Sequence, residues 1–182
     1  MHNFLDTLAL GAKKTIQSGY YRNIPPKNHT PTSLKQAIQN CKTNAVITEI
    51  KAASPSLGTI RSSINPAQIA TAMQQGGAIG LSILTEPNHF NGSLQTLIQA
   101  RNSVKLPILM KDIIVSTEQI DAAVALGADA CLLMQALFDK GHCETELKEM
   151  ISYAHNRGLE VLLETHTEAE YKTALQTDAD LI

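Results

Sequence analysis

Short apolar runs recur along this chain, and each is followed by a loop and a stretch with the hydrophobic spacing of an amphipathic helix. We expect strands at the apolar runs, which cover residues 46–51, 78–84, 106–111, 130–134, 160–164 and 180–182. Helices are expected between the strands, beginning at Asn65, Ser93, Ser116, Glu144 and Thr167. The strand starts lie 20 to 32 residues apart, which is the length of a βα unit, so the pattern predicts a parallel sheet.

The chain before the first expected strand has a different pattern. Residues 3–17 carry apolar side chains at helical spacing, with Asn3 placed as the N-cap. A polar, proline-rich connector follows over residues 23–32, and Ser33 is placed to cap a second, shorter helix. The sequence therefore predicts a helical segment ahead of the βα region.

Six successive βα units suit two parallel folds, the (β/α)₈ barrel and the doubly wound sheet. No GxGxxG or GxxxxGK[ST] loop follows any of the expected strands. The usual sequence reason to choose the doubly wound, nucleotide-binding fold is therefore missing.

The composition is ordinary for a globular chain with one sizeable core: 182 residues, 43% hydrophobic and 18% charged, with a formal net charge of -2. Lys and Arg are scattered, so we expect no binding to nucleic acid or to a membrane surface. No apolar run approaches membrane-spanning length, and the N-terminus lacks a signal-peptide pattern. The cytoplasm is the expected location.

Cysteine and histidine spacing argues against a metal site. Cys41, Cys131 and Cys143 lack the paired spacing of a disulfide framework or a zinc knuckle. No two of the six histidines lie four residues apart, as ligands on one helix face do. We expect no bound metal.

The first expected strand carries an acid and a base on one face. Glu49 and Lys51 are two residues apart, so both side chains point to the same side near the end of the strand. Because the strand is apolar, we expect it to be buried on both faces, where a charge is costly unless it is paired or used. By itself this pattern fits a structural ion pair as well as a functional site.

Polar and charged residues follow the other strands at the same end. They are Thr85, Glu86, Lys111, Asp112, Gln135 and Glu164. A purely structural role explains such a repeated pattern poorly, because each unpaired buried group costs free energy. Parallel barrels carry their functional groups at this end of the strands, the rim of the barrel, so a functional role explains the pattern better. A lysine beside a carboxylate in a dry pocket can act as a general acid, and the carboxylate can act as a base.

Five ordered segments carry a family resemblance: EIKAASPSLGTIR, LSILTEPNHFNGSL, LPILMKDIIVSTEQI, GADACLLM and LEVLLETHTEAE. From Phe4 onward the chain resembles indole-3-glycerol phosphate synthase, the ring-closing enzyme of tryptophan biosynthesis. The resemblance implies an α/β fold, a (β/α)₈ TIM barrel with an N-terminal helical extension that helps to cover the substrate. It also implies a carbon–carbon lyase that works without a cofactor. Such an enzyme removes CO₂ and water from 1-(2-carboxyphenylamino)-1-deoxyribulose 5-phosphate and closes it to indole-3-glycerol phosphate.

The resemblance implies catalytic roles for three residues. Lys111 matches the general acid that assists attack on the ketose carbonyl and loss of its oxygen. Lys51 matches a second lysine, which holds the anthranilate carboxylate and is also proposed to take part in proton transfer. Glu164 matches the glutamate that acts in the dehydration half of the reaction.

The resemblance also implies substrate-binding roles. Glu49 matches the acidic partner that orients the charge network, Ser54 matches a residue near the anionic groups of the substrate, and Phe90 matches an aromatic that lines the ring pocket. Two ammonium groups also suit a substrate with a carboxylate and a phosphate. Ile113 departs from the family, which usually has an aromatic after the Lys-Asp pair, so we expect one face of the ring pocket to pack less well.

The sequence ends at Ile182, where the family continues into a Gly-Ile-Asn-Asn-Arg segment and two further βα units. We expect an N-terminal extension over residues 1–45 and, over residues 46–182, a partial barrel with about the first five to six strands. An unclosed sheet exposes its edges, which favours self-association, and we expect little or no turnover from the isolated 182 residues.

Three hypotheses about function follow. The first is an indole-3-glycerol phosphate synthase sequence that is incomplete at its C-terminus. The second is an inactive barrel fragment that acts, if at all, through self-association or a partner chain. The third is another phosphate-binding barrel such as phosphoribosylanthranilate isomerase, which the paired lysines and the SPS turn disfavour.

Overall fold

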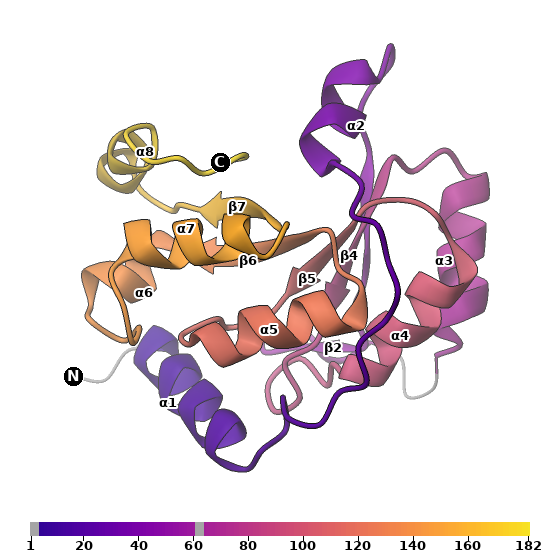
Figure 1. Cartoon of the computed structure of the whole chain (residues 1–182). Helices are drawn as coiled ribbons and strands as arrows, with labels where there is room; N and C mark the ends of the chain where they lie inside the picture. Colours follow the sequence, from indigo (N-terminus) through magenta and orange to yellow (C-terminus); the bar gives the residue numbers. More distant parts are fainter. Residues whose placement is uncertain (1–3, 61–63) are drawn as a thin grey trace.

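The chain folds around one parallel sheet. The computed structural model describes residues 4–60 and 64–182, and the strand order of the main sheet is β1-β4-β5-β6-β7 (Figure 1). These strands are β1 (Ile47–Ile50), β4 (Gly80–Leu84), β5 (Ile108–Lys111), β6 (Ala130–Met134) and β7 (Glu160–Glu164). Each strand pairs in parallel with the next one in this order, which confirms the prediction from the βα spacing. Leu181 also makes a parallel bridge to Leu162 of β7, where a further strand was expected to begin.

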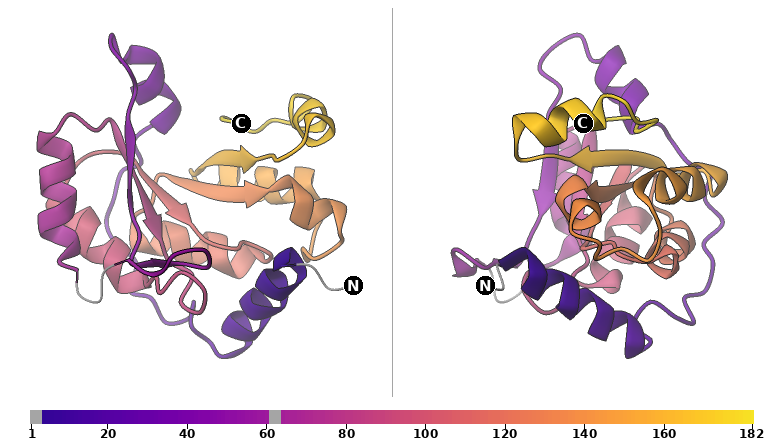
Figure 2. Two further views of the ribbon diagram at one scale, coloured as in Figure 1. Left: turned by 180° about the vertical axis from the view of Figure 1, so that it is seen from behind. Right: turned by 90° about the vertical axis from the view of Figure 1, so that its left-hand side faces the viewer.

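Helices connect successive strands and pack against the sheet. They are α3 (Pro66–Gln75), α4 (Leu94–Ser103), α5 (Thr117–Leu126) and α7 (Leu147–Asn156), and α8 (Glu168–Ala174) follows β7. Figure 2 shows that the strand direction turns progressively from β1 to β7, as in a sheet that curls toward a barrel. Repeated parallel βα units with this curl place the chain in the α/β class and support the predicted TIM-barrel architecture.

Side-chain caps determine where most of these helices begin. In each case an oxygen of the capping side chain accepts a backbone N–H from the first turn, which the helix itself leaves without a partner. The residues that cap in this way are Ser33, Asn65, Ser93, Ser116 and Thr167, as the sequence predicts. Asn3, the predicted cap of the first helix, lies outside the described residues.

Alternate strand residues form two apolar layers on opposite faces of the sheet. One layer lies under the helices and includes Leu81, Met110 and Leu133. The other includes Leu109 and Leu132 and faces the inner side of the curled sheet. The candidate site lies at the carboxyl ends of the strands, on this inner face.

The N-terminal helices close the two ends of the inner layer. In α1 (Phe4–Gln17), Leu8 is buried in the same apolar cluster as Ile113 and Met134, at the carboxyl ends of the strands. In α2 (Leu34–Asn40), Leu34 packs at the opposite end, so close to Gly80 that a Cβ there would lie 2.6 Å from its Cδ1. Figure 2 shows the two helices at opposite ends of the sheet. The division into parts 1–45 and 46–182 stays a prediction.

Three features differ from the sequence-based expectation. Residues 53–59 form a small hairpin of β2 (Ala53–Ser54) and β3 (Gly58–Thr59), and a short helix, α6 (Gln135–Asp139), follows β6 directly. The helix expected from Glu144 begins at Leu147. The reason is that the Glu144 carboxylate accepts the backbone N–H of Thr117 at 2.5 Å and so serves the start of α5 instead.

The expectation that the first strand is buried on both faces is wrong. Ile47, Thr48 and Glu49 are only half-buried, and Ile50 alone of this strand is buried. Among the described residues β1 pairs with β4 on one side only, so it is an edge strand. Central strands β4 and β6 are buried along their whole length.

No helix in the part of the chain that the structure describes has the length and apolar character to cross a membrane.

Candidate functional site

A carboxylate between two lysines forms the centre of the site. Glu49 Oε1 lies 2.8 Å from Lys51 Nζ, and Glu49 Oε2 lies 3.4 Å from Lys111 Nζ. Ser82 on β4 donates its hydroxyl to Oε2 at 3.2 Å. The parallel register places Glu49 directly beside Ser82, and Ser82 beside Leu109 of β5. Lys51 follows Glu49 by two residues and Lys111 follows Leu109 by two residues, so both lysine side chains reach the Glu49 carboxylate.

Electrostatics keep Glu49 ionised. Burial opposes its charge, but the hydrogen bond from Lys51 and the charge of Lys111 outweigh burial and hold the pKa of Glu49 below its usual value. The three side chains remain between 27% and 35% exposed. Ion pairs this exposed stabilise a fold by only about 0–1 kcal/mol, so stability alone is a weak reason for the arrangement.

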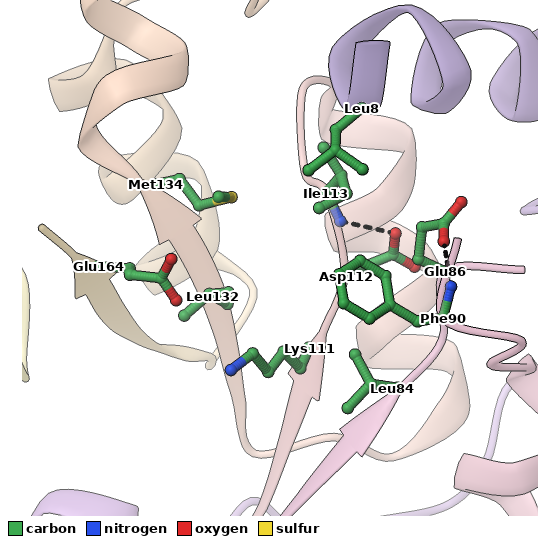
Figure 3. Close-up of a pocket in the computed structure, with 10 residues that line it drawn as sticks. All are labelled: Leu8, Leu84, Glu86, Phe90, Lys111, Asp112, Ile113, Leu132, Met134 and Glu164. Carbon is green, nitrogen blue, oxygen red and sulfur yellow. Dashed lines mark hydrogen bonds between the residues drawn. The ribbon is translucent and has the colours of Figure 1, made fainter. Parts of the chain in front are cut away.

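An apolar pocket of about 170 Å³ lies beside this charge cluster. Its lining residues are Leu8, Leu84, Glu86, Phe90, Lys111, Asp112, Ile113, Leu132, Met134 and Glu164. Figure 3 shows Lys111 and Glu164 extending into the same space from β5 and β7, with Phe90 and Ile113 across from Met134. A ring could lie against the apolar wall while an ammonium and a carboxylate face its polar substituents.

A second hollow of about 510 Å³ adjoins the pocket under α1. The two share Leu8, Phe90, Met134 and Glu164, so they form one continuous depression at the carboxyl ends of the strands. This is the end at which parallel barrels carry function.

Glu164 has a histidine neighbour that sequence reasoning did not single out. His166 Nε2 lies 3.3 Å from Glu164 Oε1, and the His166 backbone N–H donates to Glu170 Oε2 at 2.7 Å. Both carboxylates and His166 line the larger hollow. The only sequence signal was the alternation in Glu-Thr-His, which returns His166 to the side of Glu164.

Phe90 owes its position to Glu86. The Glu86 carboxylate is 2% exposed and accepts the backbone N–H groups of Asn88, His89 and Phe90, at 2.9, 2.6 and 3.0 Å. Glu86 lines the pocket, but its lone pairs are used by the loop that carries Phe90 (Figure 3). The prediction that places Glu86 with the chemically active rim residues is therefore replaced by a structural role.

Other rim residues are also engaged in structure. Asp112 is buried and accepts hydrogen bonds from Thr85 and Tyr21. Gln135 is 3% exposed, donates to Asp139 at 2.7 Å, and is not among the residues that line the pocket. Glu86 and Asp112 also line the pocket, but their carboxylates are used by backbone and hydroxyl donors. This leaves the two lysines and Glu164 as the predicted rim residues whose charged groups can meet a ligand.

Ser54 lies away from the pocket lining. Its hydroxyl oxygen accepts the backbone N–H of Leu57 at 3.2 Å and lies 3.4 Å from Ser56 Oγ, inside the β2–β3 hairpin. Its role near an anionic group of a ligand stays a prediction. Within the described ranges, His, Cys, Asp and Glu side chains form no group of three that could hold a metal ion.

Sequence comparison gives a family. The profile described as indole-3-glycerol phosphate synthase matches residues 9–182. A protein of that name from Thermococcus kodakarensis is 38% identical over 149 residues, covering 82% of this chain and 63% of its own length. Another from Methanocaldococcus jannaschii is 46% identical over 154 residues, covering 82% and 55%. A third from Aliarcobacter butzleri is 40% identical over 157 residues, covering 85% and 58%. The chain thus spans less than two thirds of the length of these relatives.

Structural comparison supports the fold alone. The chain matches an N-acetylmannosamine-6-phosphate 2-epimerase from Clostridium perfringens with a TM-score of 0.55 at 15% identity, over 84% of this chain and 65% of that one. It matches a mandelate oxidase mutant with a TM-score of 0.52 at 13% identity, over 73% and 46%.

Proposed function

Because the chain belongs to the indole-3-glycerol phosphate synthase family, we propose that its site carries out the ring closure of 1-(2-carboxyphenylamino)-1-deoxyribulose 5-phosphate to indole-3-glycerol phosphate. In this reaction a ring carbon attacks the ketose carbonyl, the carboxylate leaves as CO₂, and the former carbonyl oxygen leaves as water. The observation that carries the proposal is the pairing of Lys51 and Lys111 through Glu49 beside an apolar pocket.

Lys111 is proposed as the general acid. It extends from the end of β5 into the pocket, and its ammonium can donate a proton as the ketose oxygen becomes a hydroxyl. Ionised Glu49, 3.4 Å away, limits where this ammonium can lie. A fixed donor is effective because it needs little reorganisation when charge develops on the oxygen.

Lys51 is proposed to hold the anthranilate carboxylate. It shares Glu49 with Lys111, so the two ammonium groups and the one carboxylate together carry one net positive charge beside the pocket. That charge balances the carboxylate of a bound substrate until it is lost as CO₂. Glu49 is then a substrate-orienting group, which acts by placing both lysines.

Glu164 is proposed to take a proton in the dehydration half, and Phe90 is proposed to pack against the aromatic ring. Both line the pocket, and Figure 3 shows Glu164 on the side of Lys111, with Phe90 on the opposite wall. An acid and a base that reach one space from β5 and β7 can serve successive proton transfers without moving the substrate.

Turnover of carboxyphenylamino-deoxyribulose phosphate by the purified chain tests the proposal. The sequence led us to expect little or no turnover, but the charge cluster and the pocket are both formed within the described residues. The result expected from the structure is therefore a rise in indole fluorescence that depends on enzyme concentration and saturates with substrate. The alternative of a catalytically inactive fragment predicts a flat trace. Phosphoribosylanthranilate isomerase chemistry predicts conversion of phosphoribosylanthranilate instead, so that compound is the matched control substrate.

Self-association is a further proposal, and it rests on the edge of the sheet. The outer side of β1 has no strand beside it among the described residues, and Val46, next to it, is 49% exposed. Such an edge can pair with a second chain. Light scattering during size-exclusion chromatography should then give a molar mass of at least twice the 19.7 kDa of one chain. The mass of a single chain at micromolar concentration would overturn the proposal.

The cytoplasmic location stays an expectation.

A further inference from the structure

A buried hydrogen-bond network links the segment after α1 to the strand end that carries Lys111. Asp112 follows Lys111 directly and is 1% exposed. Its Oδ2 accepts a hydrogen bond from Thr85 Oγ1 at 2.5 Å and another from the Tyr21 hydroxyl at 3.0 Å. Its Oδ1 accepts the backbone N–H of Ile113 at 2.7 Å. One carboxylate therefore joins three parts of the chain that are far apart in sequence.

We propose that Asp112, held by the Tyr21 hydroxyl, is a positioning residue that aims Lys111 and Ile113 into the pocket, a role that rests on the function proposed above. Figure 3 shows the side chains of Lys111 and Asp112 leaving the end of β5 in different directions. Fixing Asp112 on one side therefore fixes Lys111 on the other. Thr85 adds to this, since its backbone N–H donates to the Lys111 carbonyl at 3.0 Å.

The charge state of Asp112 controls the network. Burial raises the pKa of Asp112 from 3.8 to about 6, against the effect of its three hydrogen bonds, and the negative charge of Glu86 acts in the same direction as burial. The other titratable groups that face this carboxylate from packed elements are Tyr21 and Tyr20, whose own pKa values are raised by burial and, to a lesser extent, by the charge of Asp112. Asp112 therefore changes protonation close to neutral pH.

Protonation alters what the network can hold. An ionised carboxylate accepts all three hydrogen bonds, whereas the neutral acid carries a proton at one of these positions. The Thr85 hydroxyl then has a second acceptor within reach, because the Lys111 carbonyl lies 3.5 Å from its Oγ1. The strand end around Lys111 is therefore expected to rearrange as the pH falls through about 6.

Protonation of Asp112 should disturb the position of Lys111 but increase the stability of the fold. Measurements of stability and of turnover can therefore distinguish a positioning role from a role in folding. The folded chain binds this proton more tightly than the unfolded chain, so protonation contributes stability that is complete below pH 3.8 and is lost as the pH rises through about 6. Asp112→Asn imitates the neutral acid. Its melting temperature at pH 7 should therefore not fall below that of the wild type, while its kcat falls.

The kinetic test compares pH profiles of kcat and KM for the wild type, Asp112→Asn and Tyr21→Phe. Tyr21→Phe removes a hydrogen-bond donor that favours the ionised carboxylate, so it should lower kcat about tenfold with little change in KM. It should also move the acid limb, the fall of kcat on the acidic side of the profile, to higher pH. Asp112→Asn should remove that limb, and the double variant should be no slower than Asp112→Asn alone.

A matched control is available on the outer helices. The Tyr153 hydroxyl donates to Asp121 at 3.0 Å, a tyrosine–aspartate pair away from the pocket. Tyr153→Phe should keep the wild-type kcat and pH profile. If Tyr21→Phe behaves in the same way as Tyr153→Phe, the positioning role is wrong.

A second readout does not depend on turnover. The backbone amide signals of Lys111 and Ile113 in ¹⁵N NMR should titrate with a midpoint near pH 6 in the wild type and stay flat in Asp112→Asn. Flat signals in the wild type would overturn the inference. Absence of wild-type turnover would instead overturn the proposed function, and the NMR titration would still decide whether Asp112 reorganises this strand end.

Discussion

Replacing Lys111 by methionine should lower kcat by about 10²–10⁴-fold, the contribution of a well-placed general acid. Methionine keeps the apolar stem against Leu84 and Leu132, which line the same pocket, but it removes the ammonium. The ring pocket stays filled to a similar extent, so KM should change much less than kcat. The measurement is the initial rate of indole fluorescence at saturating substrate.

Two further variants separate charge from proton transfer. Lys111→Arg keeps a positive charge for Glu49, but a guanidinium does not release its proton near neutral pH, so we expect its kcat to stay as low as that of Lys111→Met. Lys148→Met removes an exposed ammonium from α7, on the helical side of the sheet, and should leave kcat unchanged. A Lys111→Met chain that keeps most of the wild-type kcat would contradict the role of Lys111.

The fold was largely predictable because each element carries a local signal. Apolar runs at βα spacing predict the parallel sheet, and the five caps from Ser33 to Thr167 form as their side-chain chemistry requires. The short elements were not predictable in this way. Helix α6 begins directly at the end of β6 with Gln135 and has no side-chain cap, so the sequence carries no start signal for it.

The candidate site was predictable only in part. Alternation along β1 correctly brings Glu49 and Lys51 together, and strand ends bring Lys111 to the same carboxylate. Counting charges at the rim was misleading, because Glu86 and Asp112 are buried and satisfied by hydrogen bonds from backbone and hydroxyl donors. Those donors come from folded loops and from the segment after α1, which no local pattern reveals.

Asp129, at the other end of the sheet, is another residue whose hydrogen-bond partners no local sequence pattern reveals. The sequence marks it only as a residue between two alanines before β6, yet it is 1% exposed and holds three other segments of the chain together. Its Oδ1 accepts the Thr32 backbone N–H at 2.7 Å and lies 2.8 Å from His29 Nε2. Its Oδ2 accepts hydrogen bonds from Arg101 Nη1 at 2.8 Å and from the Ile108 backbone N–H at 2.7 Å. The connector after α1 is thereby tied to β5 and α4.

Asp129→Ala should lower the free energy of unfolding by about 3–5 kcal/mol, because it leaves the buried guanidinium of Arg101 without its charge partner. Urea denaturation at pH 7 measures this loss. Asp121→Ala removes a 46% exposed carboxylate that pairs with Arg157, and it should cost only about 0–1 kcal/mol. Arg101→Met added to Asp129→Ala should recover part of the loss, since the unpaired charge is then gone. Equal losses for Asp129→Ala and Asp121→Ala would mean that the connector, and with it the placement of α2, does not depend on this carboxylate.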